Sequence, residues 1–181
     1  MTPFETERLI VRDWTEEPAD LARVFDIYSR PEVHRWLGGG TRVMDDPALA
    51  VERVRIWHAR NAGHGGRYGT WAIQVRDTGR IAGTLLLKPL PGRDKGVFSD
   101  DIEIGWHLHP DSWGNGYGTE AARGALERAF AAGLPEVYAV VFPGNEASVA
   151  VTRRLGMTPL GPRTDWYGGE ELETFVLRRP S

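Results

Sequence analysis

Hydrophobic spacing changes its period partway through residues 101–131. Apolar residues alternate with polar or small residues from Ile102 to Leu108, and this period of two predicts a strand. After Gly118 the apolar residues recur three and four positions apart, which is typical of the buried face of a helix. They are Ala122, Ala125, Leu126, Ala129 and Phe130. Residues 110–118, Pro-Asp-Ser-Trp-Gly-Asn-Gly-Tyr-Gly, separate the two patterns, so a glycine-rich turn is expected between a strand and a helix.

The same reading predicts the other elements of the chain. Further strands are expected at Glu7–Trp14, Tyr68–Val75, Ile81–Lys88, Val137–Phe142, Thr158–Trp166 and Leu172–Leu177, and helices at Pro18, at Asp46-Pro47 and at Asn145–Leu155. Three successive strands between residues 68 and 108 favour an antiparallel meander, and the next helix crosses over to a further strand. We therefore expect an α/β (α+β) fold, a single domain over residues 1–181 with a mixed, mostly antiparallel central sheet.

The turn between the strand and the helix has the features of an anion site. The first turn of a helix leaves about four N–H groups without partners and carries roughly half a positive charge. Gly114, Gly116 and Gly118 have no Cβ atom to block an approaching phosphate. A dinucleotide fingerprint would need glycine in place of Thr119, and a Walker loop would need Gly-Lys followed by Ser or Thr, which does not occur. The turn thus predicts a phosphate site of neither common nucleotide type.

Composition and charge narrow the range of functions. A net charge of −3 argues against binding to nucleic acid, and the absence of cysteine excludes disulfides, thiolate zinc sites and cysteine nucleophiles. The start of the chain has no signal-peptide core and no long apolar run occurs, so a cytoplasmic protein without a membrane segment is expected. His107 and His109 share one face of a strand but have no third ligand at a telling spacing, so no metal is expected.

Three motifs resemble one protein family. Trp113-Gly-Asn-Gly-Tyr-Gly-Thr-Glu-Ala121 resembles the acetyl-coenzyme A signature of the Gcn5-related N-acetyltransferases (GNAT), with Trp113 where Gln or Arg commonly stands. Its Trp-Gly-x-Gly-Tyr form is similar to the branch of ribosomal-protein alanine and serine N-terminal acetyltransferases. Residues 145–157, with Asn145, Ser148 and then Leu-Gly-Met, resemble that branch's Asn-x-x-Ser followed by Leu-Gly-Phe. The opening at residues 6–13, followed by Arg-Pro-Glu-Val from residue 30, is the third match, and the three occur in family order.

The resemblance implies an acetyl-coenzyme A-dependent N-acetyltransferase. The acetyl group would pass from the thioester to a primary amine, a protein N-terminus or a small molecule, by direct attack. The main chain of the strand, the phosphate turn and the next helix cap would bind the cofactor. The residues concerned are Trp106, His107, Leu108, Trp113, Gly114, Asn115, Gly116, Tyr117, Gly118, Thr119 and Asn145. Asn145 also suits an ordinary helix cap, and Trp113 either contacts the cofactor or packs beneath the turn.

Two side chains are candidates for proton transfer. Glu103 lies on the strand leading into the turn, at the place where many relatives of the family have a catalytic glutamate, and the alternative is a solvated glutamate on the outer face. At about 100° per residue, Asn145, Ser148 and Thr152 form one polar stripe beside the apolar side of their helix. Thr152 stands where the family often has a tyrosine acid, so Ser148 is our candidate to protonate the leaving thiolate.

The acceptor is less constrained by the sequence. Trp36, Trp166 and Tyr167 are candidates to line an acceptor pocket, although large aromatic residues are more often core. Four acidic residues, Asp100, Asp101, Glu170 and Glu171, would either attract a cationic amine or remain solvated loop charges. The alternative to an enzyme is a catalytically inactive acyl-coenzyme A sensor that keeps the turn. A serine hydrolase is disfavoured because no Gly-x-Ser-x-Gly occurs. A homodimer is common in such folds, but nothing in these residues demonstrates one.

Overall fold

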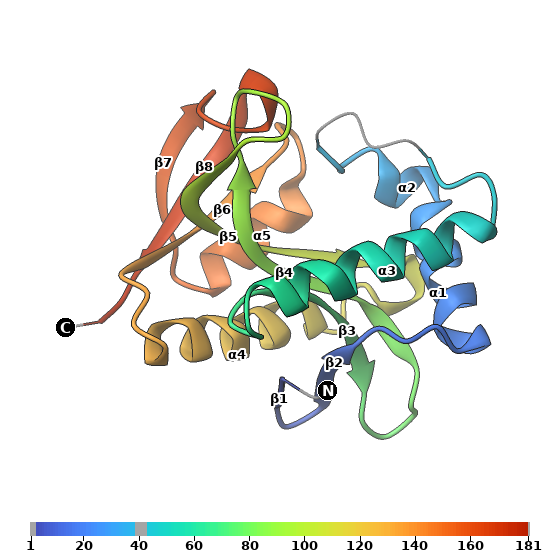
Figure 1. Ribbon diagram of the computed structural model, residues 1–181. Coiled ribbons are helices and arrows are strands. Elements are labelled where there is room, and N and C mark those ends of the chain that lie inside the picture. Colours follow the sequence, from blue (N-terminus) through green and yellow to red (C-terminus); the bar gives the residue numbers. More distant parts are fainter. Residues whose placement is uncertain (1–2, 39–42, 181) are drawn as a thin grey trace.

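The central sheet positions every element of the protein. A computed structural model describes residues 3–38 and 43–180. Within them, eight strands form one sheet in the order β1-β2-β3-β4-β5-β6-β8-β7 (Figure 1). The strands are β1 (Phe4–Glu5), β2 (Leu9–Asp13), β3 (Gly69–Val75), β4 (Ile81–Pro91), β5 (Phe98–Leu108), β6 (Glu136–Val141), β7 (Thr158–Arg163) and β8 (Leu172–Arg178). Neighbouring strands are antiparallel except for the parallel pair β5 and β6, so the predicted fold class is confirmed.

Helices cover both faces of the sheet. They are α1 (Pro18–Tyr28), α2 (Pro31–His34), α3 (Ala48–Gly63), α4 (Tyr117–Ala131) and α5 (Glu146–Arg154), with short 3-10 turns η1 (Pro110–Ser112) and η2 (Tyr167–Gly169). The apolar side of α4 packs with Ile102 and Ile104 of β5 in one core, whereas α1, α2 and α3 enclose a second core. Alternation along β5 therefore turns Trp106 and Leu108 toward α4, and Glu103 and His107 toward α1 and α3.

The parallel strands β5 and β6 meet at only one position. Glu103 is in register with Tyr138, and no further pair joins the two strands within the described residues. Beyond Glu103, β5 continues to Leu108 paired with β4 alone. The main chain after Glu103 thus has no partner strand on its β6 side, which creates an opening in the middle of the sheet.

Several element boundaries differ from the sequence expectation. β4 continues to Pro91, where a loop was expected from residue 89, because Leu90 is fully buried and extends the pairing with β5. β7 ends at Arg163 rather than at Trp166, and β8 lies between β6 and β7. The periodicity gave no sign of β1. Among the described residues, no helix combines the length and the hydropathy that crossing a bilayer requires.

Removing the apolar side chain at the centre of α4 should destabilise the protein. Leu126 is 3% exposed in the core between α4 and the sheet. We expect Leu126→Ala to lower the free energy of unfolding by about 3 kcal/mol, because the lost contacts leave a cavity. Urea denaturation measures the change. Glu127→Ala, on the exposed side of the same helix, should change stability by less than about 0.5 kcal/mol. Equal losses for the two variants would contradict the packing of α4.

Candidate active site

One large cavity reaches both faces of the sheet. Its volume is about 1260 Å³, and its lining comes from the start of α4, from α5 and β5, and from α1 and α3 on the opposite face. Pockets for one small ligand usually measure about 300–1,000 Å³. The cavity therefore has room for two reactants approaching from opposite sides of the opening between β5 and β6.

The glycine turn before α4 presents unpaired main-chain amides. Gly114 and Gly116 have φ angles of 76° and 79°, the left-handed region that favours glycine. The first main-chain bond of α4 runs from the Glu120 N–H to the Gly116 carbonyl, 3.0 Å away. Within the described residues, the N–H groups of residues 114–119 have no hydrogen-bond acceptor. A Cβ atom built on Gly114 would meet no other atom within 4 Å, so the concave side of the turn is open.

The third glycine and the asparagine of the turn have structural roles. Gly118 is buried, and a Cβ atom there would lie 3.4 Å from Leu108 and 3.6 Å from Trp106, so glycine permits close packing of α4 on β5. Asn115 donates its side-chain N–H to the carbonyls of Ser112 and Trp113, at 3.2 Å and 3.0 Å. The side-chain contacts of Asn115 are therefore directed within the turn.

Arg8 holds the glycine turn from the other end of the chain. Its guanidinium donates to the Asn115 carbonyl at 3.0 Å and pairs with Glu120 of α4 at 2.6 Å. Thr6 also donates to Glu120, at 2.6 Å. Burial alone would raise the pKa of Glu120, but the hydrogen bonds from Thr6 and Arg8 outweigh it and lower that pKa. Sequence reasoning missed this brace, because no local pattern pairs residues more than a hundred positions apart.

The end of β5 is tied to the turn through Trp113. The Trp113 indole N–H donates to the Leu108 carbonyl at 3.0 Å, while the side chain is 47% exposed. Trp113 therefore does not pack beneath the turn, although it lines the cavity. Trp106, His107 and Leu108 also line the cavity, at the point where β5 has left β6.

Helix α5 contributes a cap and a hydroxyl group to the cavity wall. The Asn145 side chain accepts a hydrogen bond from the Ser148 N–H at 3.2 Å, so Asn145 caps the helix, and both residues line the cavity. The expectation that Thr152 continues this polar row is wrong. Thr152 is fully buried and donates its hydroxyl to the Val149 carbonyl at 2.8 Å, because this part of α5 packs onto the core.

Glu103 is buried and held by two donors. Only 3% of it is exposed, which excludes the alternative of a solvated glutamate. Lys88, its cross-strand neighbour on β4, forms an ion pair with Glu103 Oε1, and the Tyr167 hydroxyl donates to the same oxygen at 2.6 Å. No described residue donates to Oε2, and Glu103 lines the cavity. One carboxylate oxygen thus remains available to a ligand. Lys88 was not predicted, because pairing across β4 and β5 becomes visible only once the register is known.

Tyr167 takes an unusual conformation to reach Glu103. It is the one residue other than glycine with a positive φ among those described, at 50°. Such a conformation costs on the order of 1–3 kcal/mol and persists only where the surroundings enforce it. Burial, the Glu103 charge and their hydrogen bond raise the pKa of Tyr167 well above its ordinary value. The phenol is therefore a stable hydrogen-bond donor at neutral pH.

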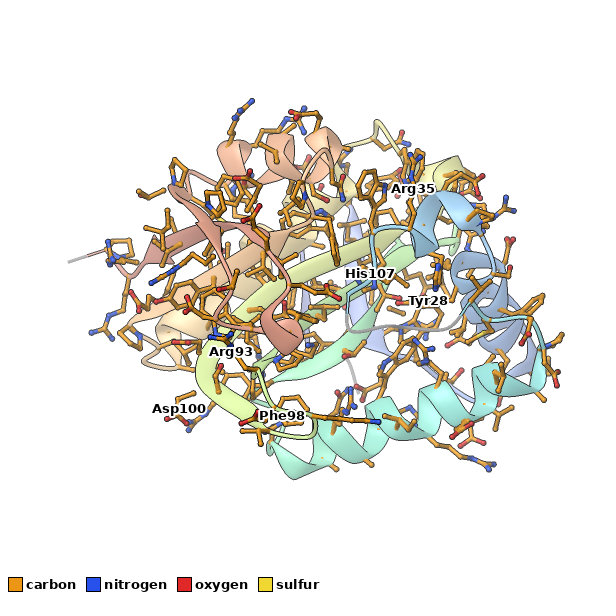
Figure 2. All side chains as sticks on the ribbon, turned by 90° about the horizontal axis from the view of Figure 1, so that it is seen from above. Tyr28, Arg35, Arg93, Phe98, Asp100 and His107 are labelled. Atoms are coloured by element: carbon orange, nitrogen blue, oxygen red, sulfur yellow. The ribbon has the colours of Figure 1, made fainter. Side chains whose placement is uncertain are left out.

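Tyr28, His107 and Arg53 form the opposite end of the cavity. The Tyr28 hydroxyl lies 3.0 Å from His107 Nδ1, and Figure 2 shows the two side chains next to each other. Burial, helped by the charges of Lys88 and Arg53, lowers the pKa of His107 to about 4. Burial also raises the pKa of Tyr28 to about 12. Both rings are therefore neutral at physiological pH.

The predicted acceptor residues are only partly brought together. Trp36 and Tyr167 line the cavity, but Trp166 does not. Trp166 is 4% exposed and donates its indole N–H to Asp101 Oδ2 at 3.0 Å, so it belongs to the packing of the sheet end. The four acidic residues proposed to attract an amine, Asp100, Asp101, Glu170 and Glu171, are all absent from the cavity lining. Figure 2 shows Asp100 far from His107 in that view.

His107 in β5 and His109 just after β5 have different partners. His107 contacts Tyr28, whereas His109 lies 2.9 Å from Asp26 and 3.0 Å from Asp111. In the described part of the chain, no group of three or more His, Cys, Asp or Glu side chains is arranged to hold a metal ion.

Comparison with known proteins identifies the family. Residues 8–158 match the family model of the acetyltransferase (GNAT) domain. The chain is 30% identical over 159 residues to the uncharacterized N-acetyltransferase YoaA of Bacillus subtilis, covering 87% of this chain and 84% of that one. An acetyltransferase from Agrobacterium tumefaciens has a similar structure, with a TM-score of 0.72, 28% identity and coverage of 97% and 93%. The fold also matches a RimL ribosomal L7/L12 α-N-protein acetyltransferase in complex with coenzyme A, with a TM-score of 0.74, 16% identity and 98% of each chain covered. The protein therefore belongs to the GNAT acetyltransferase family, as the motifs predicted, and its enzyme class is N-acetyltransferase.

The His107 ring should stay neutral far below the usual pH for histidine. NMR of the ring protons, assigned with His107→Gln, should give a midpoint at about pH 4. The folded pKa lies below the unfolded value of about 6.5. Between the two, the unfolded state binds more protons, so stability is lost as the pH falls from about 6.5 toward 4. A midpoint near 6.5 would show that burial and the neighbouring cations do not act on this ring.

Proposed function

We propose that the protein transfers an acetyl group from acetyl-coenzyme A to a primary amine by direct attack of the neutral amine on the thioester. One observation carries this proposal: a turn of unpaired main-chain amides and a buried carboxylate open into the same cavity. The amides suit a pyrophosphate, and the carboxylate suits a reacting amine. The GNAT family model and the named N-acetyltransferase relative support the reaction class.

The residues around the turn fit the cofactor. The amides of residues 114–119 would hold the pyrophosphate at the N-terminus of α4. On the side of β5 that does not pair with β6, the main chain of Trp106, His107 and Leu108 would receive the amide groups of the pantetheine arm. Arg123 and Arg154 also line the cavity on this side, and their guanidinium groups suit further phosphate oxygens. When bound, the cofactor supplies the activated acyl group.

Glu103 is our candidate for receiving the proton of the attacking amine. Lys88 and Tyr167 both act on Oε1, so they fix the carboxylate in one orientation with Oε2 directed to the amine. An α-amino group, which titrates near pH 8 and is partly neutral at pH 7, needs less help from a base than a lysine side chain does, so it is the better suited acceptor. Ser148, whose hydroxyl lies in the cavity wall, is our candidate proton donor to the departing thiolate.

A thiol-release assay tests the function directly. Acetyl-coenzyme A is mixed with the protein and with sets of peptides and small amines, and free coenzyme A is measured. We expect release that depends on the amine, with mass spectrometry finding the acetylated amine. Tight binding of the cofactor without release for any amine would overturn the enzymatic proposal in favour of an inactive acyl-coenzyme A sensor.

The cytoplasmic location and a homodimer stay predictions.

Neutralising Glu103 should affect turnover and not cofactor binding. We expect Glu103→Gln to lower kcat by about 100-fold, because general base catalysis contributes about 10²–10⁴-fold. The dissociation constant for coenzyme A should change less than twofold by calorimetry. Glu127→Gln, which is exposed and outside the cavity, should keep kcat. Thermal unfolding checks that Glu103→Gln folds. Full activity in a folded variant would remove Glu103 from the reaction.

Adding a methyl group inside the turn should weaken cofactor binding. Gly114→Ala places a Cβ atom in the open side of the turn, and we expect coenzyme A to bind at least about tenfold less tightly. Gly133→Ala is a matched control. Gly133 also has a positive φ, 93°, with open space around it, but it follows α4 and does not line the cavity. Calorimetry should show unchanged affinity for Gly133→Ala. Equal affinities for both variants would place the phosphates elsewhere.

A further inference from the structure

Arg53 contributes a cation to the lining of the cavity. It lies on α3, half-buried, and its guanidinium carbon is 5.3 Å from the centre of the Tyr28 ring. No carboxylate among the described residues pairs with it. Arg55, two positions along the same helix, differs in each respect, because it pairs with Glu16 at 2.7 Å and lies outside the cavity. The contact with Tyr28 accounts for the position of Arg53 but leaves its charge uncompensated.

The surroundings of Arg53 favour a negatively charged ligand. Arg35, directly after α2, and Arg60 of α3 also line the cavity. Among the described lining residues that α1, α2 and α3 contribute, Glu32 is the one acidic residue. Glu103 is neutralised by its ion pair with Lys88. Tyr28 and His107 carry no charge at neutral pH. This end of the cavity therefore has an excess of guanidinium groups, and a guanidinium in a partly desolvated site binds carboxylate or phosphate through paired hydrogen bonds.

We infer that Arg53 binds an oxyanion, a carboxylate or a phosphate, carried by the amine acceptor. This inference rests on the proposed function, because it places the amine at Glu103. Arg53 packs on Tyr28, which contacts His107, so the position of His107 marks this end of the cavity. Glu103 and His107 are four residues apart on one strand, which is roughly 13 Å at 3.3 Å per residue. The anionic group thus lies several bonds from the amine. An extended tripeptide, at roughly 10 Å, spans most of this separation, whereas a single amino acid does not.

Pairs of acceptors that differ in one anionic group test the role of Arg53. Triglycine is compared with triglycinamide for the carboxylate, and 6-aminohexyl phosphate with 6-aminohexanol for the phosphate. In the unmodified protein, we expect kcat/KM to favour the anionic member of at least one pair by about tenfold, since a hydrogen bond to a charged group contributes about 1.5–3 kcal/mol. The larger preference identifies the oxyanion. Equal values within both pairs would overturn the inference.

Variants of Arg53 separate anion recognition from a structural role. Arg53→Met should abolish the preference, because KM for the anionic acceptor rises toward that of its neutral counterpart. Arg53→Lys, which keeps the charge, should restore part of it, and Arg55→Met should leave it intact. A preference that survives Arg53→Met would overturn the inference, because loss of packing on Tyr28 alone would affect both members of a pair equally.

Binding measurements keep this test independent of catalysis. Calorimetry on the protein saturated with coenzyme A should show that triglycine binds more tightly than triglycinamide, and that Arg53→Met removes the difference. If no amine is acetylated, the proposed reaction fails, while this binding difference still supports the anion site. If amines are acetylated without any preference for the charged member, the anion site fails alone.

Discussion

The site depends on β5 and β6 being paired, among the described residues, at the one position where Glu103 is in register with Tyr138. A longer ladder would satisfy the main chain of both strands and close the sheet. Because the pairing stops there, the cavity passes from the side of α4 and α5 to the side of α1 and α3. The same contact places Glu103 at the point where the strands separate. A cofactor on one face and an acceptor on the other can therefore meet beside a buried carboxylate.

Unfavourable local features concentrate around this opening. Main-chain amides before α4 have no acceptor in the described part of the chain, Tyr167 has a left-handed conformation, and Glu103 is a buried charge. Each costs free energy by itself, and each is offset by contacts from distant parts of the chain. Arg8 from the start of the chain braces the turn, and Lys88 from β4 neutralises Glu103. Such features persist where function requires them, and the apolar cores on both faces of the sheet supply the stability.

Local patterns in the sequence predicted most of the elements and the turn. The change of period at Gly118, the glycine spacing and the cap at Asn145 each depend on a few neighbouring residues, and the structure has all three. Features that depend on strand register or on distant packing were not predictable. The ion pair of Lys88 with Glu103 needs the register of β4 and β5, and the burial of Thr152 and Trp166 needs the position of α5 and β8. The place of Arg53 likewise follows from how α3 crosses the sheet.

The most direct test of this account observes the amides of the turn themselves. In an NMR titration of the ¹⁵N-labelled protein with coenzyme A, the N–H signals of Gly114, Gly116 and Thr119 should shift strongly. The N–H signal of Gly133, at the far end of α4, should stay unchanged. Binding of coenzyme A that leaves the signals of the turn in place would contradict the account.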